Sequence, residues 1–131
     1  MAYSHFETRA VSEAGGTDYV IRVEGRGTTK AMAIKNAEIN AVRDVIFKDI
    51  HTTFGNHRPL MALINDPSVE IKESSFFEPF FASNGKYSEF LATTKSSAEL
   101  YTNDKEITVI MSIIVKRGYL KHYLEENHLI K

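Results

Sequence analysis

The sequence predicts an α+β domain of two layers, in which one long helix packs on a mostly antiparallel sheet. Two observations carry this prediction. Apolar residues alternate with polar ones over residues 17–24 and 107–115, a pattern typical of strands, while residues 30–48 lack glycine and proline and have helical periodicity. The order of the elements is strand, strand, helix, helical segment, two or three strands and a final helix, which indicates an α+β fold.

The length of 131 residues, 43% of them hydrophobic, fits a single domain, 1–131, with a core that needs no disulfide or structural metal. Sixteen Lys and Arg against 17 Asp and Glu give a net charge of −1, which excludes a strongly basic nucleic-acid or membrane binder. The absence of cysteine excludes thiolate zinc sites and cysteine nucleophiles. Residues 1–16 are too polar for the apolar part of a signal peptide, and the apolar runs are short, so we expect a soluble chain.

The N-terminal residues are expected to form a hairpin. The first twelve residues and residues 17–24 are its strands, with Gly15-Gly16 as the turn. Tyr19, Ile21 and Val23 share the face predicted to be buried, whereas Arg22 and Glu24 share the face predicted to be wet.

The long helix begins near Lys30, after Thr28 or Thr29 as N-cap, and runs to about Lys48. Its apolar stripe contains Ile34, Ala37, Ala41, Val42, Val45 and Ile46. The alanines lie at the centre of this stripe, so they should allow the helix to lie close to the sheet.

The middle of the chain allows two interpretations. After a polar loop over residues 51–58, residues 59–64 are expected to form one or two helical turns. Asp66-Pro67 resembles an N-cap and a first helical position, so a helix could run from Pro67 to Ala82, or a shorter one could begin near Ser75 with Pro79 in its first turn. Asn84-Gly85 is expected to supply a left-handed stop.

The C-terminal third is expected to add strands and a helix. Residues 86–93 and 98–101 are predicted to be neighbouring strands. Residues 107–115 are apolar on both faces and should lie centrally in the sheet. A helix follows Gly118 and ends at Asn127.

A glycine turn between a strand and a helix suggests an anion site. Glycines and a helix N-terminus can expose backbone amides to a phosphate. However, Lys30 stands where a dinucleotide fingerprint has its third glycine, so a plain tight turn is the favoured interpretation. A small-molecule or anion-binding protein or enzyme using this turn is kept as the alternative function, with the candidate residues Gly25, Gly27, Thr28, Thr29 and Lys30.

Four phenylalanines form the densest apolar feature of the sequence, and core packing is its favoured role. On a helix they form two lines, one with Phe76 and Phe80 and the other with Phe77 and Phe81. We expect one line to be buried against the sheet. The other would be covered by the loop over residues 51–65, by the last helix near Tyr123 or by another chain, which makes it the candidate interaction surface.

Catalytic and metal-binding patterns are missing from the sequence. Its five histidines lack a ligand spacing, and no G-x-S-x-G elbow occurs. We therefore predict no catalytic residue, no metal, no cofactor and no enzyme activity. A basic patch of Lys116, Arg117 and Lys121 gives nucleic-acid binding little support.

Two stretches carry a family resemblance. Residues 23–50, VEGRGTTKAMAIKNAEINAVRDVIFKDI, resemble the strand, G-x-G turn and alanine-rich helix of bacterial envelope lipoproteins related to the N-terminal domain of the flagellar accessory protein T. Residues 76–91, FFEPFFASNGKYSEFL, together with Val45-Ile46-Phe47, are similar to a small uncharacterised envelope lipoprotein family of Gram-negative gut anaerobes, whose pattern is A-V-x-x-V-I-F, F-F-x-x-F-F and G-K-Y-x-x-F.

The resemblance implies a two-layer α+β fold, a lipoprotein signal in the full-length precursor and a place in the cell envelope or periplasm. This chain has no signal peptide and no cysteine, so either Met1 begins a shortened chain or this member is cytoplasmic. The resulting expectation is a non-enzymatic envelope module for binding or assembly. It would act through a protein partner or self-association, without nucleic acid, and meet the membrane only through a lipid anchor in the precursor.

Overall fold

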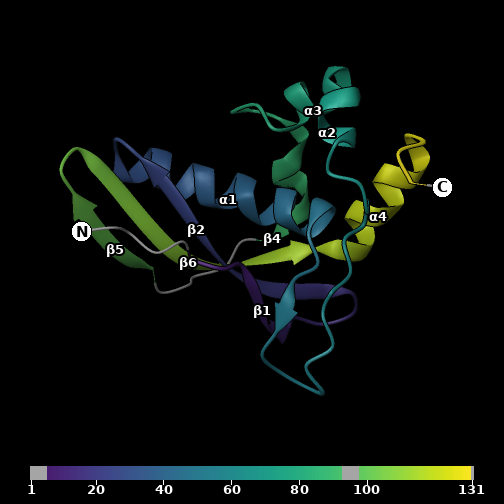
Figure 1. Ribbon diagram of the computed structural model, residues 1–131, viewed down its shortest axis with the longest axis horizontal. Helices are drawn as coiled ribbons and strands as arrows, with labels where there is room; N and C mark the ends of the chain where they lie inside the picture. The colour runs from purple at the N-terminus through teal and green to yellow at the C-terminus, as the bar shows by residue number, and fades with distance from the viewer. Residues whose placement is uncertain (1–5, 93–97, 131) are drawn as a thin grey trace.

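The structure is a computed structural model that describes residues 6–92 and 98–130. In these residues a mixed sheet is covered on one face by the long helix α1 (Lys30–Phe47), as Figure 1 shows. The strands have the order β3 (His51–Thr52), β1 (Arg9–Glu13), β2 (Asp18–Gly27), β6 (Glu106–Lys116) and β4 (Leu91–Ala92), and β5 (Glu99–Asn103) also pairs with β6. All strand pairs except β1 with β3 are antiparallel, so the predicted two-layer α+β fold with a mostly antiparallel sheet is confirmed.

The predicted N-terminal hairpin is present, but its first strand is shorter than predicted, because residues 6–8 are not in a strand, and residues 1–5 lie outside the described part. Strand β1 (Arg9–Glu13) pairs with β2 (Asp18–Gly27), with a register shift between Ala10 and Ser12. The turn uses positive φ at two glycines, +94° at Gly15 and +56° at Gly16, a region that only glycine adopts readily.

The longest strand, β6 (Glu106–Lys116), lies in the centre of the sheet as expected. One of its edges pairs with the whole of β2. Its other edge carries β4 (Leu91–Ala92) and then β5 (Glu99–Asn103). The predicted pairing of residues 86–93 with residues 98–101 is therefore wrong, because both segments align on β6 instead of on each other.

A 3-10 helix, η1 (Lys86–Phe90), replaces most of the strand predicted at residues 86–93, of which residue 93 lies outside the described part. Tyr87 and Phe90 are both buried, at 2% and 0% exposure. Residues three apart lie on the same side of a 3-10 turn but on opposite faces of a strand. Burying both aromatic rings in one core therefore favours the helical turn.

Helix α1 follows the sequence prediction closely. The Thr29 hydroxyl caps it by accepting a hydrogen bond from the Met32 amide at 3.1 Å. Ala37 and Ala41 are fully buried in its contact with the sheet. Gly25 in β2 lies directly below this contact, and a Cβ there would overlap the Ala33 carbonyl oxygen. Small residues on both elements thus allow the close approach of the two layers.

Residues 59–64 are not helical, so the prediction of one or two turns there is wrong. Leu60 instead forms an antiparallel bridge with Ile50, with two hydrogen bonds of 2.8 Å. The Ile64 amide donates to the Ile46 carbonyl at 2.7 Å. The backbone groups of this segment are therefore satisfied by distant parts of the chain, a choice that local propensity does not encode.

Two short helices follow, α2 (Val69–Lys72) and α3 (Ser74–Phe80), so no single helix runs from Pro67. The alternative start near Ser75 agrees with α3, but Pro79 lies in its last turn and not in its first. The predicted left-handed stop is also wrong: Gly85 has φ −77°. This glycine is needed because a Cβ would overlap the Phe80 and Pro79 carbonyl oxygens.

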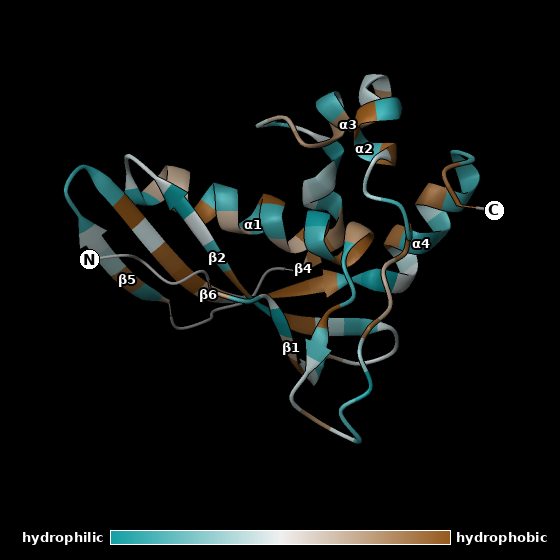
Figure 2. Ribbon diagram, viewed as in Figure 1, coloured by the Kyte–Doolittle hydropathy of each residue, from teal (hydrophilic) through white to brown (hydrophobic). Residues whose placement is uncertain are grey.

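The last helix, α4 (Arg117–Glu126), begins one residue before Gly118 and ends at Asn127 as predicted. Its inner face, with Leu120 and Leu124, closes the end of the core. Figure 2 shows the apolar residues along β6, on the side of α1 that faces the sheet and on α4. No helix in the described residues combines the length and the apolar content needed to cross a membrane.

Candidate functional site

A groove of about 1210 Å³ lies beside the C-terminal half of α1. Four further parts of the chain border it: residues 6–8 before β1, strand β2, the chain around β3, and the start of α2. The charged residues that line it are Glu7, Glu24, Arg43, Asp44, Lys48, Asp49, His51 and Glu70, and the others are Phe6, Thr8, Asn40, Phe47, Ile50, Pro59 and Pro67. We call it the α1 groove.

Acidic side chains outnumber basic ones in the α1 groove, with five carboxylates against one arginine and one lysine. Both cations are already paired with acids. Arg43 Nε lies 3.0 Å from Glu70 Oε2, and Lys48 Nζ lies 3.4 Å from Asp44 Oδ1. Of the other three carboxylates, Glu24 pairs with Arg26, so Glu7 and Asp49 are those outside ion pairs among the described residues, and they leave the groove negative on a molecule whose net charge is only −1.

Arg43 and Asp44 are fixed by neighbours on other elements. The Arg43 guanidinium lies over the Phe81 ring, 4.5 Å from its centroid, in addition to its pair with Glu70. Asp44 is 7% exposed, and its Oδ2 accepts a hydrogen bond of 2.6 Å from the Thr8 hydroxyl. These contacts hold the N-terminal segment and α2 against α1, and so they set the shape of the groove.

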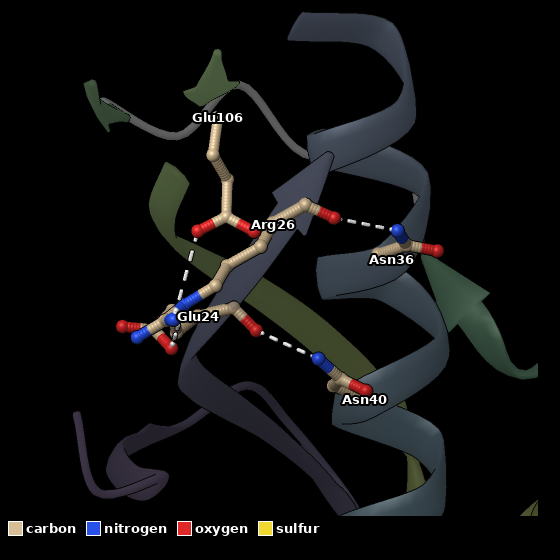
Figure 3. Close-up of polar contacts among 5 residues, drawn as sticks. All are labelled: Glu24, Arg26, Asn36, Asn40 and Glu106. Atoms are coloured by element: carbon tan, nitrogen blue, oxygen red, sulfur yellow. Dashed lines mark hydrogen bonds and ion pairs between the residues drawn. The ribbon is translucent and has the colours of Figure 1, made fainter. Parts of the chain in front are cut away.

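Glu24 carries a carboxylate oxygen, Oε2, that is buried and has no hydrogen-bond partner among the described residues. Its other oxygen lies 3.2 Å from Arg26 Nε, and Arg26 Nη1 lies 3.7 Å from Glu106 (Figure 3). The Glu24 side chain is 14% exposed, less than its predicted place on a wet face suggests. Leaving a carboxylate oxygen without a donor costs free energy, so the pair with Arg26 is what compensates the buried charge of Glu24.

Two asparagines of α1 fix the part of β2 that borders the groove. Asn40 Nδ2 donates to the Glu24 carbonyl oxygen at 2.9 Å, and Asn36 Nδ2 donates to the Arg26 carbonyl oxygen at 2.6 Å (Figure 3). Beyond Arg22, β2 has no pairing with β1. The side-chain amides therefore take the place of a neighbouring strand at this edge.

The residues of the candidate anion site form the turn between β2 and α1, but the glycines have a packing role there. A Cβ on Gly25 or Gly27 would overlap the backbone of α1. The Thr29 hydroxyl already accepts the hydrogen bond from the Met32 amide, and Thr28 and Lys30 are exposed. Anion binding at this turn stays a prediction. The close packing of the turn against α1 is by itself a sufficient reason for the two glycines.

Three of the four predicted interaction phenylalanines are in the core. Phe77, Phe80 and Phe81 are 1%, 3% and 8% exposed, and Phe76 is half-buried. The line of Phe77 and Phe81 is thus buried, whereas in the other line Phe80 is buried and Phe76 keeps an exposed part, so the two lines do not divide cleanly between core and surface. Tyr123 of α4 covers Phe76 and Phe80, with ring centroids 6.0 and 6.1 Å away, so one of the predicted covers is present. A partner beside Phe76 stays a prediction.

Sequence reasoning missed the α1 groove as a site. Its lining comes from five separate segments, and no short motif joins Glu7, Glu24 and Asp49. The one available signal was the pair Arg43-Asp44, two charges in the apolar second half of the long helix. Within residues 6–92 and 98–130, no group of three or more His, Asp or Glu side chains is placed to hold a metal ion.

Comparisons of this chain with protein-family models, with curated proteins and with solved structures found no match.

Proposed function

We propose that this protein is a binding module, not an enzyme, and that its α1 groove takes a cationic segment of a partner protein. The observation that carries the proposal is the surplus of carboxylates that line the groove, among them the exposed Glu7 and Asp49. A guanidinium or ammonium group supplies the donors that these oxygens lack, and charge-assisted hydrogen bonds of this kind are strong.

The size of the groove favours a chain segment over a small metabolite. Small-molecule pockets usually enclose about 300–1000 Å³. The α1 groove is larger and open to solvent. An extended segment with an arginine or lysine could lay its backbone along the groove and direct the charged group toward the carboxylates.

A binding role also agrees with how the charges are engaged. Arg43 with Glu70 joins α1 to α2, and Lys48 with Asp44 is a pair one turn apart at the end of α1. Such pairs preorganise a surface, which reduces the entropy lost when a partner binds.

The cell envelope is the proposed location, and its support is the resemblance of residues 23–50 and 76–91 to envelope lipoproteins. Fractionation of cells that express the tagged full-length gene product tests it. Recovery with the envelope fraction is the expected result, and recovery only in the cytoplasmic fraction would contradict it.

Calorimetry with a short peptide that contains arginines tests the proposed binding. Replacing the exposed Glu7 carboxylate of the groove by an amide in Glu7→Gln keeps the shape but removes the charge, so we expect binding to weaken by about tenfold, in line with hydrogen bonds to charged groups. The matched control is Glu106→Gln, because Glu106 is also an exposed carboxylate but does not line the groove.

The control variant should bind like the unchanged protein, and a peptide with glutamate in place of arginine should not bind. Equal loss of affinity in both variants would contradict the proposal, as would equal binding of the acidic peptide.

A further inference from the structure

Among residues 6–92 and 98–130, no strand pairs with the outer edge of β5, the edge that points away from β6. All five residues of β5 are exposed, and Leu100 and Tyr101 are each 49% exposed. Within the described residues, β5 pairs only with β6. It contains no lysine, no proline and no bulge, the devices that usually protect such an edge.

The other edges of this sheet are protected. Asn36 and Asn40 occupy the free part of β2, as described above. Strand β3 (His51–Thr52) is shielded by the chain that follows it, because the Thr52 hydroxyl donates to the Arg58 carbonyl oxygen at 2.8 Å. Strand β4 is only two residues long. The long and unprotected β5 therefore stands out on this molecule.

The pairing of β6 with β2 and with β5 determines which backbone groups of β5 point outward, away from β6. The Glu24 carbonyl oxygen accepts a hydrogen bond from Asn40 of α1, so the backbone groups of Glu24 point away from β6. Ile110 lies opposite Glu24 on β6, and its own N–H and C=O groups therefore point away from β2, toward β5. Glu99 pairs with Ile110 and thus faces β6. By alternation, the backbone amides and carbonyls of Leu100 and Thr102 point outward, where a further strand can reach them.

We propose that a second copy of this chain docks on β5, antiparallel and about a twofold axis at Tyr101, so that the two sheets become one. In this register Leu100 of each copy forms a hydrogen-bonded pair with Thr102 of the other. The two Tyr101 side chains face each other at the axis as a non-hydrogen-bonded pair, the arrangement in which side chains lie closest.

The charges of β5 suit a second copy. Glu99 lies opposite Asn103 of the other copy, so the amide of Asn103 can donate to a carboxylate and no like charges meet. The Glu99 carboxylate is also neutralised within its own chain, 3.0 Å from Arg22 Nη2. The other face of the strand brings Leu100 against Thr102, a pair without charge. Pairing of two copies through β5 therefore places no unpaired charge at the new contact.

Sedimentation velocity over a range of concentrations measures the association. The unchanged protein is expected to shift from its monomer mass of 14.8 kDa to twice that mass. Tyr101→Lys places two ammonium groups together at the axis and should leave a monomer. The matched control is Tyr119→Lys, since Tyr119 is 51% exposed but lies on α4, and this variant should still dimerise.

A cysteine scan tests the register, because the chain has no cysteine of its own. Tyr101→Cys should form an intermolecular disulfide under mild oxidation, since the paired Cα atoms lie about 4.5 Å apart. Asn103→Cys, on the same face of the strand, should not. A monomer at every concentration, a dimer that persists in Tyr101→Lys, or crosslinking at Asn103 and not at Tyr101 would overturn the proposal.

Discussion

At the scale of single residues, the close approach of α1 to the sheet explains why glycine and alanine occupy several positions. Gly25 lies where α1 passes over β2, and it faces the fully buried Ala33 and Ala37. A turn motif seen in the sequence alone suggests a ligand at such a glycine. The structure instead shows backbone atoms of α1 in the volume that a side chain would need.

Gly25→Ala should therefore destabilise the protein. Its Cβ would meet main-chain atoms of α1, which cannot move aside as a side chain can, so we expect a loss of about 3 kcal/mol or somewhat more. Urea unfolding measures the loss. Thr28→Ala, at an exposed site in the same turn, is the control and should stay within about 0.5 kcal/mol of the unchanged protein. Equal stabilities of the two variants would mean that α1 lies farther from β2.

Glu38 of α1 gives a prediction about pH. Burial raises the pKa of its carboxyl above 4.5, and Lys35 offsets only part of this effect. A raised pKa in the folded state means that the stability contributed by the protonated form is complete below pH 4.5 and is lost as the pH rises through the folded pKa. Glu38→Gln should thus be more stable than the unchanged protein at pH 7, and this advantage should shrink toward pH 4.

Asp66 predicts the opposite dependence of stability on pH, because its pKa is lowered and not raised. The hydroxyl and the amide of Ser68 donate to its carboxylate and hold its pKa below 3.8. Asp66→Asn should therefore lose stability at neutral pH and approach the unchanged protein only as the pH falls. Unfolding midpoints measured from pH 7 down to about pH 2, below the usual pKa of an aspartate, separate the two cases, and parallel curves for Glu38→Gln and the unchanged protein would contradict the assignment.

At the scale of elements, α3 is anchored by its aromatic residues and not by its length. It has seven residues and contains a proline, too short to be stable alone. Phe77 packs edge-on against Phe47 of α1, with ring centroids 5.3 Å apart. Phe81, the residue that follows α3, places its ring beneath Arg43, so the end of this helix also supports one wall of the α1 groove.

Phe77→Ala should cost about 3–5 kcal/mol, the usual range for removing a buried phenylalanine. Phe76→Ala should cost clearly less, because Phe76 is only half-buried. Thermal melting of the two variants, with sedimentation to confirm that their mass is unchanged, measures the difference. Similar losses at both positions would show that the ring of Phe76 is also in the core.

Elements with strong periodicity could be predicted from the sequence, and those defined by distant partners could not. The limits of α1 and β6 follow from long apolar patterns and from the cap at Thr29. In contrast, Leu60 pairs with Ile50, and Tyr87 and Phe90 turn together into the core. These choices depend on which backbone groups and cavities the rest of the fold leaves open. For the same reason the groove, built from five segments, has no counterpart in any local motif.

At the scale of the whole molecule, the two proposed contacts lie far apart on the sheet. The α1 groove lies at the C-terminal half of α1 beside β1, whereas β5 lies at the opposite end of the sheet (Figure 1). A dimer through β5 would leave both grooves open. Binding of a cationic segment and self-association can therefore be tested independently, and the loss of one need not affect the other.

The location of a bound cationic segment tests the central claim most directly. An isotope-labelled sample is titrated with the arginine peptide while the backbone amide resonances are followed by NMR. We predict saturable shifts that cluster at Glu7, Thr8, Asn40 and Asp44, and that decrease with added salt because the contact is between charges. Shifts that cluster at the turn between β2 and α1 or along β5, or no saturable shift at all, would contradict a binding site in the α1 groove.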